Sequence, residues 1–130
     1  MKKHLGEVLD KAKMGKVKKD NDIVAVSVFG SFARNEKYRD IDVCLFLKPG
    51  MSRGKMSKKR LAYMAALGGK LDIHIFQQMP LPLKHRILKE GKVIYCSDEG
   101  AFYDMAYLTA KEFEDFKHIY KGYLEAVKYA

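Results

Sequence analysis

The chain has 130 residues, 48% of them hydrophobic and 32% charged, a composition that argues against a disordered protein and for one globular domain spanning residues 1–130. Its apolar stretches are shorter than the roughly 20 residues of a membrane span, and its two cysteines form neither a metal-binding motif nor a disulfide framework. We therefore expect a soluble cytoplasmic protein without a membrane association. The formal charge of +9 favours polyanionic partners such as nucleotides or nucleic acid, although solvated helix faces and loops also explain the lysine clusters.

The first half of the chain predicts a helix, two strands and a second helix. Residues 2–18 carry apolar side chains at i, i+3, i+4 and i+7 with lysines elsewhere, which is typical of an amphipathic helix. "DIVAVSVFG" (22–30) is rich in β-branched residues and predicts a largely buried strand, and "DIDVCLFL" (40–47) predicts a second. "KMSKKRLAYMAALGG" (55–69) predicts a helix that ends at a glycine pair suited to a C-cap.

The second half predicts two strands and two helices. "LDIHIF" (71–76) favours a third strand, and "PLKHRILKEG" (82–91) has a proline near a helix start and a glycine at its end. "KVIYC" (92–96) favours a short fourth strand, and residues 100–128 favour a long helix with one apolar stripe. Core packing explains this stripe, and so does a surface that binds a partner or a second copy of the chain. Its members are Phe113, Phe116, Tyr120, Tyr123, Leu124 and Val127.

Three aspartates are predicted to meet on one face of the sheet. Side chains alternate across a strand, so Asp40 and Asp42 share a face, with about 7 Å between their Cα atoms. In the third strand Asp72 and His74 share a face, and in-register pairing would bring Asp72 beside the other two aspartates. Converging carboxylates raise one another's pKa unless a cation lies among them, and Mg²⁺ prefers such oxygen ligands together with substrate phosphates. We expect a metal site, with His74 either lining the nucleotide pocket or satisfied within its strand.

A glycine and a serine follow the first strand, where a phosphate group would need to bind. Gly30 ends the strand, and Ser31 suits the N-cap of a short helix over "SFARN" (31–35). The free N–H groups of such a terminus bind anions, and Arg34 adds a charged donor. A simple turn and a structural ion pair are the alternative interpretations of these residues.

Together these features resemble a known family. "GSFARNEKYRDIDV" (30–43), followed by Asp72 in "LDIHIF", resembles the signature of the polymerase-β-type nucleotidyltransferases, and in particular of their minimal nucleotidyltransferase branch. The family pattern is G-S-x-A-R-G, a short variable segment, and S-D-x-D. "PLPLKHRILKEGKVIY" (80–95) and "FEDF" (113–116) are similar to later parts of these proteins, so the resemblance covers nearly the whole chain.

The resemblance implies an α+β fold, with a mixed sheet of about four strands flanked by helices and a long C-terminal helix. It also implies a single nucleotidyltransferase domain that transfers a nucleoside monophosphate, AMP from ATP, to a hydroxyl of a protein or nucleic acid. By position, Gly30 and Ser31 match the residues that hold the triphosphate of the NTP. Asp40 and Asp42 match the carboxylates that bridge two Mg²⁺ ions. Asp72 matches the third carboxylate, which binds the catalytic ion and helps to deprotonate the acceptor.

Three features depart from the family pattern. Asn35 stands where glycine is usual, and asparagine enters the left-handed backbone region more readily than most residues. Arg39 replaces the usual serine, and the segment between Arg34 and Asp40 is about two residues shorter than in the commonest form. The guanidinium of Arg39 could pair with a carboxylate that should hold metal, which bears on turnover more than on nucleotide binding.

The resemblance also implies partners. Minimal nucleotidyltransferases often act as antitoxins beside a helical toxin of the HEPN type, so the apolar stripe of the last helix is the expected contact with such a toxin or the interface of a homodimer. Two alternatives stay open. One is a non-catalytic module that binds a nucleotide or a partner, and the other is a basic nucleic-acid-binding domain, which only the net charge supports.

Overall fold

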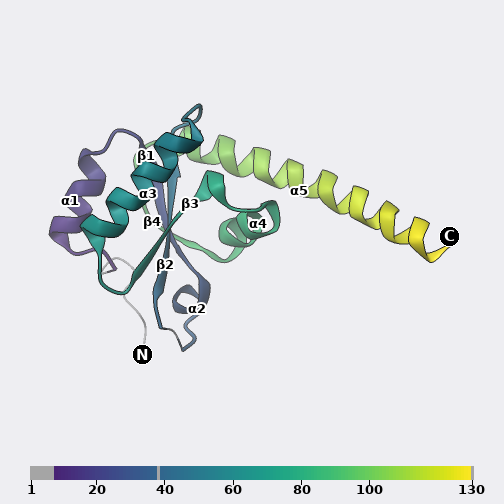
Figure 1. Cartoon of the computed structure of the whole chain (residues 1–130), viewed down its shortest axis with the longest axis horizontal. Helices are drawn as coiled ribbons and strands as arrows, with labels where there is room; N and C mark the ends of the chain where they lie inside the picture. Colours follow the sequence, from purple (N-terminus) through teal and green to yellow (C-terminus); the bar gives the residue numbers. More distant parts are fainter. Residues whose placement is uncertain (1–7, 38, 130) are drawn as a thin grey trace.

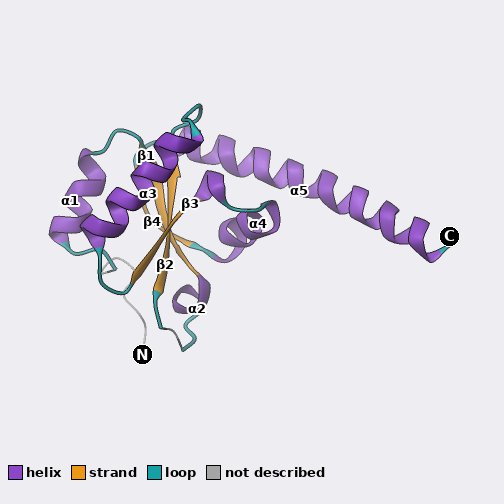
Figure 2. Ribbon diagram, viewed as in Figure 1, coloured by secondary structure: helices purple, strands orange, loops and turns teal. Residues whose placement is uncertain are grey.

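The computed structural model describes residues 8–37 and 39–129 (Figure 1). The predicted order of elements is confirmed, including a short helix after the first strand, and a 3-10 turn after the third strand is additional (Figure 2). The elements are α1 (Lys11–Lys19), β1 (Ile23–Phe29), α2 (Gly30–Ala33), β2 (Ile41–Leu47), α3 (Arg53–Leu67), β3 (Leu71–Ile75), η2 (Phe76–Gln78), α4 (Leu81–Glu90), β4 (Lys92–Cys96) and α5 (Glu99–Lys128).

The four strands form one mixed sheet in the order β3-β2-β1-β4. β1 is antiparallel to both β2 and β4, whereas β2 and β3 are parallel and are joined by the crossover helix α3. This arrangement confirms the expected α+β fold with a mixed four-stranded sheet and a long C-terminal helix.

Helices cover both faces of the sheet, so β1 is buried along its whole length. α1 and α3 lie on one face, and α4 with the start of α5 lies on the other (Figure 2). The first core is formed mainly by Val17, Val26, Val43, Leu45, Tyr63, Leu67 and Ile73. The second core is formed by Val24, Phe29, Cys44, Phe46, Phe76 and Ile87, with Phe102 and Met105 of α5 packed against them.

The first helix begins later than its apolar periodicity predicts. Residues 2–7 lie outside the described part of the chain, and residues 8–10 precede the helix. Asp10 is the N-cap, and its carboxylate accepts a hydrogen bond of 2.9 Å from the Lys13 backbone N–H. The buried Leu9 therefore packs into the core from the segment before α1. The capping carboxylate decides where the helix begins, and the apolar spacing does not.

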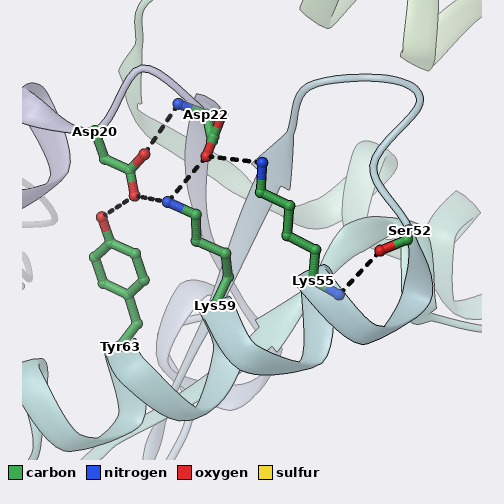
Figure 3. Close-up of polar contacts among 6 residues, drawn as sticks. All are labelled: Asp20, Asp22, Ser52, Lys55, Lys59 and Tyr63. Carbon is green, nitrogen blue, oxygen red and sulfur yellow. Dashed lines mark hydrogen bonds and ion pairs between the residues drawn. The ribbon is translucent and has the colours of Figure 1, made fainter.

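A network of charged side chains ties α3 to the loop between α1 and β1 (Figure 3). Lys59 Nζ lies 2.6 Å from Asp20 Oδ2 and 3.1 Å from Asp22 Oδ2, and the Tyr63 hydroxyl donates to Asp20 at 2.7 Å. Burial by itself would raise the pKa of Asp20, but the hydrogen bonds from Lys59 and Tyr63 outweigh it and lower that pKa. These contacts hold α3 in place over the face opposite α4.

The second half of α5 extends away from the rest of the molecule (Figure 1). Thr109 is the one residue of α5 that is buried among those the structure describes. Phe113 stacks on His85 of α4 at 3.8 Å between ring centroids, but the apolar stripe beyond it is exposed. Within this chain, core packing therefore does not account for the stripe after Phe113. None of the described helices combines the length and the apolar character needed to cross a membrane.

Candidate functional site

Asp42 and Asp72 are register partners in the parallel pair β2 and β3. Because both strands start at the same end of the sheet, the two carboxylates lie side by side, with His74 one step further along the same face of β3. One ligand atom from each of Asp42, Asp72 and His74 lies within 4.8 Å of the others. The topology thus brings together two of the three predicted carboxylates and adds an imidazole.

Asp40 does not belong to this group of side chains. β2 begins at Ile41, so Asp40 lies in an exposed bend before the ladder, where the strict alternation of a strand no longer fixes its direction. Among the described residues, the cluster of potential metal ligands comprises Asp42, Asp72 and His74. The assignment of Asp40 to the metal site stays a prediction.

His74 lies closer to the carboxylates than the sequence indicates. Its Nε2 is 3.0 Å from Asp72 Oδ2 and 3.4 Å from Asp42 Oδ1, which are ion-pair distances. Nε2 is nevertheless buried and makes no hydrogen bond within the described part of the chain, so its N–H direction meets neither oxygen. The interpretation of His74 as a satisfied strand histidine stays a prediction, and its position beside two carboxylates is the finding. The sequence signal was its two-residue spacing from Asp72, which puts both side chains on one face.

The environment of Asp42 disfavours its charged form. Burial is the largest cause that raises the pKa of Asp42, and the neighbouring Asp72 raises it further, while His74 acts in the opposite direction. The net effect is a raised pKa. A cation between the two carboxylates would remove this penalty, so the residues present fit a divalent ion.

The turn after β1 approaches Asp42 because its first residue is glycine. Gly30 has φ 75°, in the left-handed region, and a Cβ at this position would overlap the Asp42 carboxylate. Gly30 opens α2, and Phe29 occupies the N-cap position, so the prediction of Ser31 as the N-cap is wrong. The helix starts at the left-handed Gly30, so its N-cap lies two residues earlier than predicted. Asn35, at φ 60°, adopts the left-handed conformation that the family's glycine would favour.

A pocket of 190 Å³ lies beside Asp42, between α2 and α4. Its walls carry both positive and negative side chains, so a bound anion would be attracted by some of them and repelled by others. The lining residues are Phe29, Gly30, Ser31, Arg34, Asp42, Leu83, Arg86 and Glu90.

Arg34 lines this pocket and also forms ion pairs. Its Nε lies 3.0 Å from Glu36 Oε1, and its Nη1 lies 3.4 Å from Glu90 Oε2. Glu36 is the main reason that the pKa of Arg34 is raised, with a smaller contribution from Glu90. The structure therefore contains the ion pair that was one of the two alternatives for Arg34, and it leaves the guanidinium next to the pocket.

Arg86 brings a second guanidinium to the pocket from α4. No local pattern in the sequence indicates this position of Arg86, because none shows that α4 packs beside α2. The other arginine of concern, Arg39, is exposed, and within the described residues it forms no ion pair with Asp40 or Asp42. The expected competition of Arg39 for a metal-binding carboxylate is therefore not seen.

Residues 13–100 match the family model described as polymerase beta, nucleotidyltransferase. The chain belongs to the polymerase beta nucleotidyltransferase family. The matched segment runs from α1 to the start of α5 and contains every residue of the Asp42, Asp72 and His74 cluster and of the pocket.

A comparison of sequences finds a curated relative of this chain. Over 75 residues, the chain is 39% identical to a candidate protein adenylyltransferase of Methanocaldococcus jannaschii, and the aligned part is 56% of each chain. The chain therefore spans about half the length of this curated relative.

Solved structures share the fold at low sequence identity. A chain of a toxin-antitoxin complex with AMP-PNP has a TM-score of 0.66 at 15% identity, covering 92% of this chain and 98% of that one. A chain of the complex between tri-AMPylated Shewanella oneidensis HEPN toxin and MNT antitoxin has a TM-score of 0.62 at 14% identity, covering 89% and 93%. At these identities the likeness concerns the fold alone.

Proposed function

We propose that this chain, as one domain of residues 1–130, is a minimal nucleotidyltransferase that transfers AMP from ATP to a hydroxyl group of a protein. The observation that carries the proposal is the pairing of Asp42 and Asp72 beside the pocket that Gly30 and Ser31 line, in a member of this family. The adenylyltransferase relative supports AMP as the transferred group and a protein as the acceptor.

Asp40, Asp42 and Asp72 are the proposed ligands of two Mg²⁺ ions. Carboxylate oxygens suit this hard cation, and the raised pKa of Asp42 fits a site that holds a positive charge. When bound, such ions supply stabilisation of the charge on the attacking and leaving oxygens of an in-line displacement.

The residues of the chain itself have distinct proposed tasks. Gly30 and Ser31 hold the triphosphate at the turn between β1 and α2, and the guanidinium of Arg34 contacts it after leaving Glu90. An oxygen of the Asp72 carboxylate accepts the proton of the acceptor hydroxyl. That hydroxyl oxygen forms the new bond to the α-phosphorus as the bond to the pyrophosphate leaving group breaks.

The acceptor is proposed to be a toxin of the HEPN type, so that the chain would be the antitoxin of a toxin-antitoxin pair. The solved neighbours with an AMPylated toxin and with AMP-PNP support this choice. The exposed apolar side chains of α5 are the proposed contact surface, with a homodimer as the other use of the same helix. The cytoplasmic location stays a prediction.

A non-catalytic nucleotide-binding module is the second candidate function. It is favoured by the ion pairs that engage Arg34 and by the position of Asp40 outside the cluster. Nucleic-acid binding has only the charge of +9 in its favour.

The test is a calorimetric titration of ATP, with and without Mg²⁺, together with transfer of label from ATP labelled at the α-phosphate to the partner toxin. Wild type is compared with Asp42→Asn and with Asp104→Asn, a matched change at an exposed position of α5. Loss of Mg²⁺-dependent binding and of transfer in Asp42→Asn alone supports the proposal. Binding without transfer supports the non-catalytic module, and ATP binding that Asp42→Asn leaves unchanged contradicts both.

A further inference from the structure

His74 is the feature of the site that neither the family pattern nor the proposed Mg²⁺ chemistry uses. Its imidazole is fixed in place, because Cys44 is its register partner on β2 and the ring of Phe29 packs against it at 5.4 Å between centroids. The side chain is 21% exposed, and its Nε2 is the buried atom that faces the two carboxylates. A buried polar atom without a hydrogen bond costs free energy unless something else binds it.

We propose that His74 Nε2 is a third protein ligand of the ion held by Asp42 and Asp72, and that this nitrogen makes the site prefer Mn²⁺ and related transition-metal ions over Mg²⁺. This inference rests on the proposed function, since it concerns the ion at the same carboxylates. Mg²⁺ takes oxygen ligands almost exclusively, whereas an imidazole nitrogen binds first-row transition ions well.

The distances in the cluster fit this role. An octahedral ion about 2.1 Å from its ligands separates adjacent ligand atoms by about 3.0 Å. Nε2 lies 3.0 Å from Asp72 Oδ2 and 3.4 Å from Asp42 Oδ1. All three ligand atoms lie within 4.8 Å of one another, as they would around one ion.

The direction of Nε2 separates this role from that of a simple hydrogen-bond donor. An imidazole that only hydrogen-bonded to the carboxylates would point an N–H at one of the oxygens. Nε2 instead forms no hydrogen bond with either oxygen, close as both are. A nitrogen that lies close to both carboxylates without a hydrogen bond to either is available to coordinate an ion held between them.

The experiment measures metal binding directly and needs no catalysis. The affinities of the full chain for Mn²⁺ and for Mg²⁺ are compared in wild type, in His74→Leu and in His118→Leu, a matched histidine at an exposed position of α5. We expect wild type and His118→Leu to favour Mn²⁺, and His74→Leu to lose that preference by about tenfold or more. In a second variant, His74→Asp, the all-oxygen ligand set should shift the preference toward Mg²⁺.

A spectroscopic measurement on the wild-type protein makes the test independent of whether the variants fold. Pulsed electron paramagnetic resonance of bound Mn²⁺ should show hyperfine coupling to one nitrogen, and the coupling should be absent in a folded His74→Leu. Wild-type Mn²⁺ without nitrogen coupling would overturn the proposal, as would His74→Leu binding Mn²⁺ as tightly as wild type or more tightly. In either case, Mg²⁺-dependent ATP binding and label transfer still decide the proposed function separately.

Discussion

Asp42 on β2 and Asp72 on β3 are direct register partners in the sheet, and the carboxylate of Asp42 also lies against the backbone of Gly30 on the neighbouring turn. The proposed metal-binding end of the site and its proposed phosphate-binding end therefore share one side chain. A change at Gly30 should for this reason affect both folding and binding.

Replacement of Gly30 by alanine should destabilise the protein and abolish ATP binding. The left-handed φ of 75° costs an alanine about 1–2 kcal/mol, and the new Cβ would in addition overlap the Asp42 carboxylate. We expect the free energy of unfolding, measured with urea, to fall by more than 2 kcal/mol, on the order of the two costs combined.

Gly15→Ala is the matched control for Gly30→Ala. Gly15 lies inside α1 with open space around its Cα, so alanine there should stabilise the helix by about 0.5–1 kcal/mol. In the Asp42→Ala background, Gly30→Ala should cost only the free energy of placing alanine in the left-handed backbone region, because the overlapping carboxylate is absent. Equal costs in both backgrounds would show that the overlap contributes nothing.

Replacement of Glu90 by glutamine should raise the affinity for ATP. Glu90 lines the pocket and pairs with Arg34 at 3.4 Å. The change therefore removes a negative charge from the pocket wall, and the Arg34 guanidinium then pairs with Glu36 alone and can bind a phosphate group. A gain of about 1 kcal/mol, roughly fivefold in Kd by calorimetry, is expected for a partly exposed charge. The exposed Glu112→Gln serves as control, and an unchanged Kd in Glu90→Gln would argue that the triphosphate lies elsewhere.

Replacement of Asp20 by asparagine should destabilise the protein in a pH-dependent way. The pKa of Asp20 is lowered in the folded protein, so its stabilising contribution is present above the pKa of the unfolded chain and disappears as the pH falls through the folded pKa. At neutral pH we expect a loss of roughly 1–3 kcal/mol from the contacts with Lys59 and Tyr63.

Unfolding measured from neutral to strongly acidic pH checks this expectation for Asp20. The difference between Asp20→Asn and wild type should shrink once the pH is below about 3.8, the ordinary value for aspartate. The exposed Asp104→Asn, measured over the same pH range, is the matched control. A pH-independent difference would mean that packing, and not charge, explains the loss.

Polar substitutions in the second half of α5 should leave folding intact and remove partner binding. Val127 is 57% exposed and Leu124 is 48% exposed, so Val127→Ser combined with Leu124→Ser should change the free energy of unfolding by less than about 1 kcal/mol. Ile87→Ser, in the buried core, should cost several times more, about 3 kcal/mol.

Partner binding by the α5 variant is measured by size-exclusion chromatography and by capture of the proposed HEPN-type toxin partner. Loss of toxin binding in a stably folded variant supports α5 as the contact surface. If wild type is instead a dimer that the variant converts to a monomer, the helix serves self-association. A variant that keeps both toxin binding and the oligomeric state of wild type would show that the stripe has neither use.

Local patterns in the sequence determined most of the elements of this protein. The β-branched runs of β1 and β2 and the proline and glycine that bound α4 act over a few residues, so their effect can be predicted without knowledge of the fold. The motif around Gly30 and Asp42 likewise indicates the family from local sequence, without knowledge of how the strands pair. The start of α1 was mispredicted because the Asp10 cap outweighed an apolar periodicity that begins before the first residue of the helix.

The tertiary structure alone decided which side chains meet. Alternation along a strand tells which residues share a face, but the ladder of backbone hydrogen bonds sets where β2 begins and which residue of β3 lies opposite Asp42. For that reason Asp40 lies outside the cluster and His74 lies inside it. The presence of Arg86 and Arg34 in one pocket depends on the packing of α4 beside α2, a contact between segments about 50 residues apart that no local pattern encodes.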